Sequence, residues 1–338
     1  MAEMQTTKKA VAVAVQCGLT PLIWGVPGIG KTQFSYALGR VLNKKVYTII
    51  SALREPQDFQ GLPMPKEELL NGKTIRVASF IPPAWIKRIA YEGNALIFLD
   101  EIDKARREVQ NALLRLVLER RLNIDDEEIF LPDSVAFVAA ANPPDKGGDW
   151  ELSPPLANRF MHLMMKADVD TFFKGMVYGD WGDDELPQVP PDWEAYLPAQ
   201  KVLIATFIKR NPSLLEAFPE NPEQQGRAWP SPRTWEMAAK YLAACEATKT
   251  EDEVKVVGVE GLVGEGAALA FFNFVKKLDL PDPLDVLLDP TLLPTHPDSL
   301  FVILAAIPTI IRDEQEWLLG FELLRRVEQD KGVDYALV

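Results

Sequence analysis

Eight consecutive residues, Gly25–Thr32, have the types and spacing of a phosphate-binding loop, G-x-x-x-x-G-K-[ST]. Glycines allow the backbone to wrap closely around an anion, so that successive N–H groups point inward. Lys31 can reach the β- and γ-phosphates of a nucleotide, and the Thr32 hydroxyl can bind magnesium. An apolar run before the loop and a helical pattern over Gln33–Leu42 supply the strand and helix that such a site requires. The residues expected to hold the nucleotide here are Gly25, Val26, Pro27, Gly28, Ile29, Gly30, Lys31, Thr32 and Gln33.

Two carboxylates, Asp100 and Glu101, directly follow an apolar run. A buried parallel strand places its C-terminal residues at the edge of the sheet where ligands bind. We therefore expect Asp100 to hold magnesium, directly or through water, and Glu101 to orient and deprotonate the attacking water. Asp103 has two interpretations: a further group at the site, or the cap of a helix that begins near Lys104.

A second run of small apolar residues, Val135–Ala141, ends at Asn142 before two prolines. A carboxamide at that strand end could hydrogen-bond both the γ-phosphate and the attacking water. The alternative is an asparagine that serves turn chemistry before proline. Its spacing after the acidic pair favours the functional interpretation.

Short apolar runs alternate with helical patterns in the first half of the chain. Runs of this length, bounded by Gly, Asp, Asn or Pro, are typical of buried strands, and the helical periodicity between them indicates a parallel sheet with crossover helices. The clearest crossover is Lys104–Arg121, which has one apolar face among charged residues. The predicted strands are Pro21–Trp24, Lys45–Ser51, Ala95–Asp100, Ser134–Ala141 and Phe160–Met165.

After Asp168 the pattern changes. Residues 176–198 are rich in Gly, Pro, Trp and Asp, which indicates a connection between domains. We therefore divide the chain into an α/β nucleotide-binding core over 1–175, a connecting segment over 176–198, and a smaller, mainly helical domain over 199–338. The helices predicted in the last domain are Ala199–Lys209, Pro232–Ala247, Gly264–Lys277, Pro297–Ile311 and Asp313–Gln329.

Composition restricts the class of function. Hydrophobic residues make up 47% and charged residues 25%, as in an ordinary globular protein. The formal charge of −13 argues against general binding to a nucleic-acid backbone and favours protein partners. Cys17 and Cys245 lie far apart, which argues against a disulfide scaffold and favours a reducing cytoplasm. Without an apolar run of membrane-spanning length or a signal-peptide pattern, we expect a soluble cytoplasmic protein.

The order of these motifs resembles that of AAA+ ATPases. More narrowly, the chain is similar to the MoxR group, which is related to the dynein-type AAA modules, through the segments Asp103–Leu114 and Pro154–Phe160. The resemblance carries specific motifs over about residues 5–245. It implies a P-loop NTPase core of three layers, α/β/α, with a parallel sheet, followed by a helical lid, and it implies ATP and Mg²⁺ as the cofactors. ATP rather than GTP follows from the resemblance alone.

The resemblance also assigns roles residue by residue. Arg159, in Leu-Ala-Asn-Arg159-Phe, matches the arginine finger that reaches the γ-phosphate of a neighbouring subunit, and Arg233, in Ser-Pro-Arg233, matches sensor 2. The alternatives are a structural helix-end arginine for Arg159 and a surface residue for Arg233. The remaining matches are Walker A at Gly25–Thr32, Walker B at Leu96–Glu101 and sensor 1 at Asn142. The catalytic candidates are therefore Lys31, Glu101, Asn142 and Arg159.

Residues 54–82 contain Asn71-Gly72 followed by the strand-like Thr74–Phe80, which is a hairpin signal. This segment resembles the hairpin that the MoxR group inserts near its second helix, which faces the pore of an assembled ring. A second hairpin is expected at Leu122–Leu131, around Asp125-Asp126. Both are candidates for contact with a partner, and the alternative is that they only connect elements.

The resemblance implies an ATPase that forms a homo-oligomeric ring, a hexamer, and remodels, activates or loads a cofactor into a protein client. Such a client often carries a von Willebrand factor A domain. One alternative is a nucleic-acid motor or loader, against which the charge and the lack of a basic, aromatic-interleaved stretch argue. The other is a nucleotide-gated scaffold with little turnover, against which the intact Asp100 and Glu101 argue.

Overall fold

The computed structural model describes residues 3–124, 127–143, 152–278 and 280–331. The chain divides into two units. The first comprises Met1–Gln188 and Pro219–Ala228, and the second comprises Val189–Phe218 and Trp229–Val338. Segment 219–228 therefore groups with the first unit, although it lies within the part of the sequence predicted as the helical domain.

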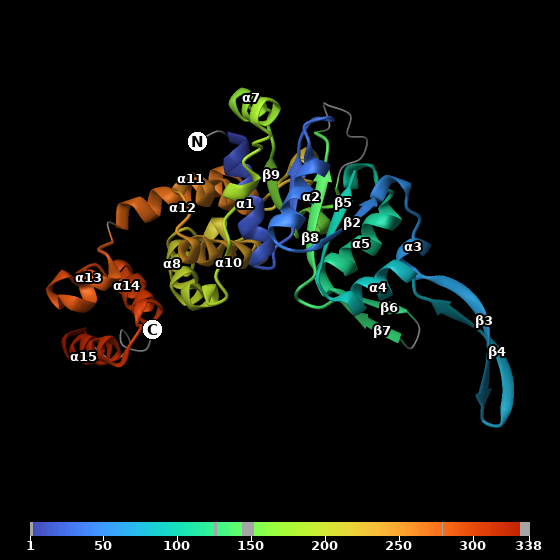
Figure 1. The fold of residues 1–338 in the computed structure, drawn as a ribbon. Coiled ribbons are helices and arrows are strands. Elements are labelled where there is room, and N and C mark those ends of the chain that lie inside the picture. The colour runs from blue at the N-terminus through green and yellow to red at the C-terminus, as the bar shows by residue number, and fades with distance from the viewer. Residues whose placement is uncertain (1–2, 125–126, 144–151, 279, 332–338) are drawn as a thin grey trace. The chain divides into compact units, whose positions relative to one another are not determined.

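Five parallel strands form the central sheet of the first unit, in the order β2-β5-β8-β1-β9 (Figure 1). Each strand lies within two residues of its predicted bounds, and the sheet with its flanking helices confirms the predicted α/β class. The strands are β1 (Pro21–Trp24), β2 (Lys45–Ile50), β5 (Ala95–Asp100), β8 (Ala136–Ala141) and β9 (Met161–Met164).

Helices cover both faces of this sheet. Leu22 and Trp24 share one buried cluster with Leu113 of α5, whereas Ile23 points to the opposite face because successive strand residues alternate. Helices α1 and α2 contact the strands, and their buried residues lie outside that cluster. The helices of the first unit are α1 (Glu3–Gln16), α2 (Lys31–Val41), α3 (Gln57–Gln60), α4 (Ala84–Glu92), α5 (Arg107–Glu119), α6 (Pro154–Ala157), α7 (Val169–Tyr178) and α9 (Pro222–Gln225).

Helix α1 was not predicted from the sequence. It runs over Glu3–Gln16 and includes the apolar run Ala10–Val15, which is buried throughout. Its buried side also includes Thr6, Thr7 and Lys8. These polar residues interrupt the apolar periodicity by which an amphipathic helix is recognised.

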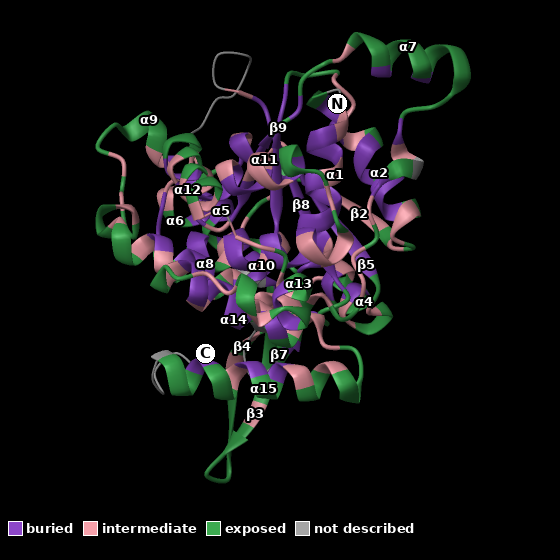
Figure 2. Ribbon diagram, turned by 90° about the vertical axis from the view of Figure 1, so that its left-hand side faces the viewer, coloured by how far each residue is buried: buried purple, intermediate pink, exposed green. Residues whose placement is uncertain are grey.

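Two β-hairpins extend from the core. Strands β3 (Leu62–Leu70) and β4 (Lys73–Ile81) pair only with each other, and Asn71 and Gly72 both have positive φ, as a tight two-residue hairpin turn requires. Figure 2 shows this hairpin as mostly exposed. Strands β6 (Arg121–Ile124) and β7 (Glu127–Phe130) form the second hairpin, whose expected turn at Asp125-Asp126 lies outside the described residues.

The second unit is helical in its described part, as the sequence predicts. Phe207, Trp235 and Phe271 pack together with ring centroids 5.4–5.9 Å apart. A separate apolar cluster joins the last three helices around Ile303 and Ile307. The helices are α8 (Leu197–Arg210), α10 (Pro232–Thr248), α11 (Asp252–Val263), α12 (Glu265–Leu278), α13 (Pro283–Leu288), α14 (Pro297–Ile310) and α15 (Glu314–Lys331).

Helix α11 was also missed, because its valines and two glycines are poor helix formers. Packing overrides that propensity. A Cβ on Gly258 would lie 2.0 Å from a ring atom of Tyr241, and the Tyr241 hydroxyl donates to the Val254 carbonyl oxygen at 2.8 Å. Within the described ranges, no helix combines the length and apolarity needed to cross a bilayer. Cys17 and Cys245 are buried free thiols.

Candidate nucleotide site

The predicted phosphate loop, acidic pair and Asn142 meet at one edge of the sheet because three neighbouring strands end there. β5, β8 and β1 are adjacent and parallel, with Leu99 opposite Ala139 and Trp24 opposite Ala141. Asp100 closes β5, Asn142 follows β8, and the loop Gly25–Gly30 follows β1. The carboxyl ends of parallel strands form the usual ligand-binding edge of an α/β sheet.

Lys31 lies at the centre of this cluster. Its Nζ donates to the carbonyl oxygens of Gly25 at 2.6 Å and Val26 at 3.3 Å, and to Oδ1 of Asn142 at 2.9 Å. Burial lowers the pKa of Lys31, and the nearby carboxylates of Asp100, Asp103 and Glu101 oppose that shift. Among the described residues, the ammonium hydrogen-bonds only to neutral oxygens.

Asn142 is buried, and its orientation follows from its partner. Lysine is a donor only, so the atom that faces Lys31 is the amide oxygen. The Nδ2 hydrogens of Asn142 are left to donate to another acceptor. A phosphate oxygen beside the ammonium is an acceptor of the right kind.

Thr32 and Asp100 supply two hard oxygen donors side by side. The Thr32 hydroxyl donates to Oδ2 of Asp100 at 3.1 Å, while the other oxygen of Asp100 accepts the backbone N–H of Glu101 at 3.0 Å. Mg²⁺ prefers such oxygens and usually completes its shell with water and phosphate. Across the described ranges, no three or more His, Cys, Asp or Glu side chains come together as a metal site. Thr32 and Asp100 would therefore need water and phosphate to complete the coordination of Mg²⁺.

Glu101 leaves the strand in a left-handed conformation, with φ at 51°. Its carboxylate accepts a hydrogen bond from Lys104 Nζ at 3.2 Å, and both side chains are about one-third exposed. The carboxylate that is predicted to activate water is therefore engaged by a lysine in this structure. Lys104 occupies Oε1 and would compete with a water for this carboxylate.

Asp103 does not cap the following helix. A short 3-10 turn, Ile102–Lys104, intervenes after β5, so α5 begins at Arg107 with Arg106 at its N-cap and no side-chain cap. Asp103 is buried instead, and neither carboxyl oxygen has a hydrogen-bond partner among the described residues. Burial raises the pKa of Asp103, against the weaker opposing effect of the Asn142 backbone amide.

The loop backbone is shaped for an anion. Gly28 and Gly30 have φ of 84° and 98°, in the left-handed region that favours glycine, and no atom lies within 4 Å of a Cβ built on either. Gly25 is tighter, since a Cβ there would lie 3.1 Å from the Met165 carbonyl oxygen. Val26, Pro27 and Gly28 face solvent, as a loop that admits phosphate requires.

The two predicted arginines, Arg159 and Arg233, belong to segments other than the phosphate loop and the ends of β5 and β8. Arg159 is in the turn between α6 and β9, where Nη1 donates to the Pro155 carbonyl oxygen. Arg233 is in the first turn of α10 in the second unit, next to the capping box formed by Ser231 and Thr234. The roles of Arg159 as a finger and Arg233 as a sensor stay predictions.

A cavity of about 610 Å³ opens beside the phosphate loop. Gly28, Ile29 and Gly30 form one wall, and Gln33 and Phe34 of α2 continue it. The remaining walls come from α1, from the chain after β9, and from residues 181–183. The cavity is therefore continuous with the predicted phosphate loop. Gln33 lines this cavity, and its contact with a nucleotide stays a prediction.

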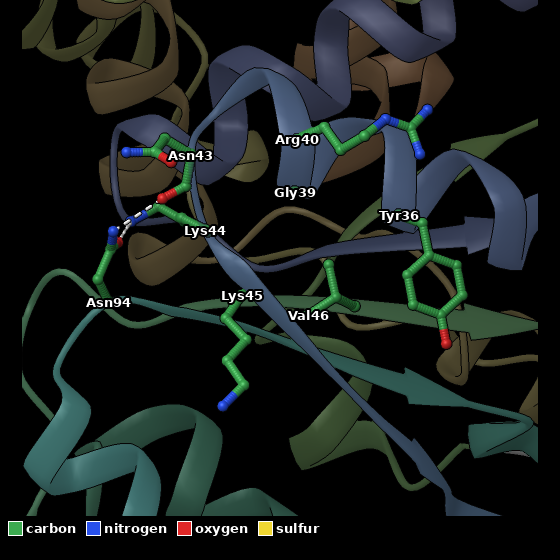
Figure 3. Close-up of a pocket in the computed structure, with 8 residues that line it drawn as sticks. All are labelled: Tyr36, Gly39, Arg40, Asn43, Lys44, Lys45, Val46 and Asn94. Carbon is green, nitrogen blue, oxygen red and sulfur yellow. Dashed lines mark hydrogen bonds between the residues drawn. The ribbon is translucent and has the colours of Figure 1, made fainter.

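A second hollow, of about 590 Å³, lies at the opposite edge of the sheet, where β2 begins (Figure 3). Tyr36, Gly39 and Arg40 of α2 border it, and Lys44 donates to Asn94 at 3.1 Å. It has neither a glycine-rich loop nor a carboxylate pair. We assign it no part in phosphate chemistry.

Sequence reasoning missed a contact that fixes the base of the loop. Trp24 Nε1 donates to Nδ1 of His162 at 3.0 Å, so His162 Nε2 carries the proton and donates to the Ala157 carbonyl oxygen at 2.9 Å. The Arg227 guanidinium lies 3.9 Å from the centre of the Trp24 ring. Each residue stands alone in the sequence, without a motif, and only the pairing of β1 with β9 brings Trp24 and His162 together.

A protein-family model matches the part of the chain that holds this geometry. The family model of the AAA domain, dynein-related subfamily, matches residues 21–160. The matched residues include the loop, the acidic pair and Asn142, and they end at Phe160.

The chain also resembles parts of larger curated proteins. The structural protein ORF618 of Acidianus two-tailed virus is 30% identical over 161 residues, which cover 46% of this chain and 24% of that protein. The Lon protease of Borrelia duttonii is 26% identical over 164 residues, covering 46% of this chain and 18% of the protease. The chain therefore spans about a quarter or less of the length of these relatives.

One solved structure matches most of the chain. A candidate ATPase from Cytophaga hutchinsonii superposes with a TM-score of 0.50 over 81% of this chain and 90% of that chain, at 16% sequence identity. At this identity the likeness shows the fold. An AAA+ α/β core followed by a helical C-terminal region is the architecture that the sequence predicts.

Proposed function

We propose that this chain hydrolyses ATP with Mg²⁺ at the shared edge of β1, β5 and β8, as a MoxR-type AAA+ ATPase that acts on a protein partner. The observation that carries the proposal is the hydrogen-bonded cluster at that edge, in which Lys31 reaches Asn142 and Thr32 reaches Asp100. These contacts join a phosphate-binding loop to a carboxylate and a carboxamide from two other strands. A glycine-rich turn without a role in phosphate binding has no need of them.

The residues present fit both cofactors. Lys31 is a buried ammonium that lacks a negatively charged hydrogen-bond partner among the described residues, and a phosphate would provide that charge. Thr32 and Asp100 would hold Mg²⁺, which when bound draws negative charge from the phosphate oxygens. Lys31 then neutralises further charge, and the free Nδ2 of Asn142 donates toward the γ-phosphate. Glu101, released from Lys104, orients the water and takes its proton.

The finer assignment rests on the motif resemblance. Arg159 would complete the site of a neighbouring subunit in a homo-oligomeric ring, a hexamer, and Arg233 would sense the nucleotide from the helical domain. The β3–β4 hairpin, exposed and paired only with itself, would contact a protein client, for which a von Willebrand factor A domain is the first candidate. The client would be remodelled, activated or loaded with a cofactor.

The test of the ring assignment separates binding from turnover. We expect Arg159→Ala to bind ATP normally and to hydrolyse it about 10³-fold more slowly, as for other trans-acting arginines. Arg115→Ala, an exposed arginine on α5, is the matched control and should turn over like the unmodified chain. Normal turnover by Arg159→Ala would show that this arginine is not a finger. Stimulation of hydrolysis by DNA, with a steep salt dependence, would instead favour the nucleic-acid motor.

One observation favours a second candidate, the nucleotide-gated scaffold. The Lys104 ammonium competes with a water for the Glu101 carboxylate. If that pair persists with ATP bound, the chain would bind nucleotide and hydrolyse it little. Single-turnover measurements decide between the two: a scaffold retains ATP for hours in the unmodified chain, and Lys104→Ala accelerates its hydrolysis.

A further inference from the structure

The Trp- and Pro-rich stretch after α7 lines the cavity of about 610 Å³ beside the phosphate loop. Trp181 and Asp183 line this cavity together with Gly28 and Gly30 of the phosphate loop. The Trp181 side chain is 41% exposed, and Asp183 is partly exposed. An aromatic surface and a carboxylate therefore border the space into which a nucleoside would extend from the loop.

Both residues are held in place by the buried Lys8 of α1. Its Nζ donates to the Trp181 carbonyl oxygen at 2.7 Å and to Oδ1 of Asp183 at 2.9 Å. Gln5, one turn earlier, donates to the same carbonyl oxygen at 2.9 Å. Gly182, between the two residues, has φ of 71°, and a Cβ there would lie 1.9 Å from Gln5 Nε2, so this approach requires glycine.

The Trp181 ring is fixed on one side by α7. A Cβ on Gly175 would lie 2.3 Å from a ring atom of Trp181, so the ring packs directly on the helix backbone. Its exposed part is left for the cavity. A rigid aromatic surface of this kind stacks on a planar base at little entropic cost.

The Asp183 carboxylate has one oxygen that can accept a further hydrogen bond. Oδ1 accepts from Lys8, and the second oxygen makes no hydrogen bond with any described residue. An ionised carboxylate only accepts hydrogen bonds, so it selects a base edge that presents a donor. The exocyclic amine of adenine, the base of the proposed nucleotide, is such a donor.

We propose that Trp181 and Asp183 read the base of the bound nucleotide, Trp181 by stacking on it and Asp183 by accepting a hydrogen bond from the exocyclic amine of adenine. This inference rests on the proposed nucleotide function and adds the base specificity that the phosphate loop cannot supply. Lys8 acts as a positioning residue, because it fixes both groups without facing the base itself.

Inosine triphosphate is the probe that tests this inference, because it carries a carbonyl oxygen where ATP carries the amine. We expect the unmodified chain to bind ATP about tenfold more tightly than inosine triphosphate, the value of one hydrogen bond to a charged group. Asp183→Asn keeps the size of the side chain and adds an amide donor that suits the carbonyl. It should lower ATP affinity, raise that of inosine triphosphate, and bring their ratio near one.

Controls separate base reading from folding and from the proposed function. Glu185→Gln makes the same charge change in the same 3-10 turn without lining the cavity, and should leave the ratio unchanged. Trp181→Phe should keep most of the affinity for both nucleotides, whereas Trp181→Leu should lose several-fold for both. If the unmodified chain hydrolyses ATP but Asp183→Asn keeps the original ratio of affinities for ATP and inosine triphosphate, only the proposal of base reading is overturned. An unmodified chain that binds neither nucleotide overturns the proposed function itself.

Discussion

At the scale of single residues, the site depends on a buried ammonium whose hydrogen-bond acceptors among the described residues are neutral oxygens. Lys31 donates to the Gly25 carbonyl and to Asn142 Oδ1, and burial lowers its pKa. The sequence predicted the members of this cluster, because the loop and the acidic pair are contiguous motifs. It did not predict Lys8 or Asp183, which lie 175 residues apart and form a pair only in the folded chain.

The carboxamide of Asn142 can be tested by two substitutions. Asn142→Ala removes the proposed Nδ2 donor, so we expect kcat for ATP to fall about 10²–10³-fold with a smaller change in KM. Asn142→Asp places a carboxylate 2.9 Å from Lys31, where it would compete with phosphate for the ammonium, so ATP binding itself should weaken. Steady-state kinetics and equilibrium binding measure the two effects. If Asn142→Ala and Asn142→Asp changed kcat and ATP binding by the same amounts, Asn142 would not be a donor to the γ-phosphate.

The lowered pKa of Lys31 predicts an alkaline limit to ATP affinity. The charged form binds phosphate, and burial makes the free chain lose that charge at a pH below the usual 10.5. Affinity should therefore fall as the pH rises through the lowered pKa of Lys31. Lys31→Arg keeps its charge over this range, so its weaker binding should stay flat with pH. An unmodified chain whose affinity falls with pH no more than that of Lys31→Arg would show that the ammonium does not bind the phosphate.

At the scale of elements, the strands were predictable and several connections were not. The five runs that predict strands are short, apolar and bounded by turn residues, and each became a strand of the sheet. Helix α5 begins later than predicted because the turn Ile102–Lys104 intervenes. Helices α1 and α11 were missed because packing in the fold, rather than periodicity or propensity, determines them.

The hydrogen bond between Trp24 of β1 and His162 of β9 makes the free energy of unfolding depend on pH. Burial lowers the pKa of His162 to about 4, so the neutral ring is retained in the fold, whereas the unfolded chain binds a proton near pH 6.5. This contribution is complete above pH 6.5 and is lost as the pH falls toward 4. The ring keeps some exposure, so we expect about 2 kcal/mol. His162→Gln lacks the titration, and the free energies of unfolding of the two proteins should converge below pH 5. A constant difference from pH 4 to 7 would contradict this account.

The β3–β4 hairpin should be dispensable for the core. Its strands pair only with each other, and Pro63 lies opposite Phe80, so residues 64–79 can be replaced by Asn-Gly without changing that register. Because most of its side chains are exposed, stability should change by less than about 1 kcal/mol. Basal ATP turnover should be retained and any stimulation by the client lost. A large loss of stability or of basal turnover would assign the hairpin to the core.

At the scale of the whole molecule, the sequence predicted an α/β core and a helical remainder, and both are present. Segment 219–228 was not foreseen in the first unit, because its contact through Arg227 and Trp24 leaves no periodic signal in the sequence. Assembly into a ring is a property of several chains, so one sequence can only suggest it through Arg159.

Mixing two inactive chains tests that assembly. Lys31→Ala cannot bind phosphate properly, and Arg159→Ala cannot assist a neighbour, so each alone should be nearly inactive. In a mixed ring an Arg159→Ala chain can receive Arg159 from a Lys31→Ala neighbour. Random heterologous assembly at equal amounts should then restore roughly a quarter of normal turnover per site. Activity that does not exceed the sum of the separate chains would contradict a finger supplied in trans.

The most direct test of the central claim, that this site hydrolyses ATP, is the turnover of Glu101→Gln. The carboxamide keeps the shape of Glu101 but cannot take a proton from water. We predict that ATP still binds with Mg²⁺ and that turnover falls about 10²–10⁴-fold. Glu108→Gln, an exposed carboxylate on α5, should hydrolyse ATP at the normal rate. Unchanged hydrolysis by Glu101→Gln would contradict the account.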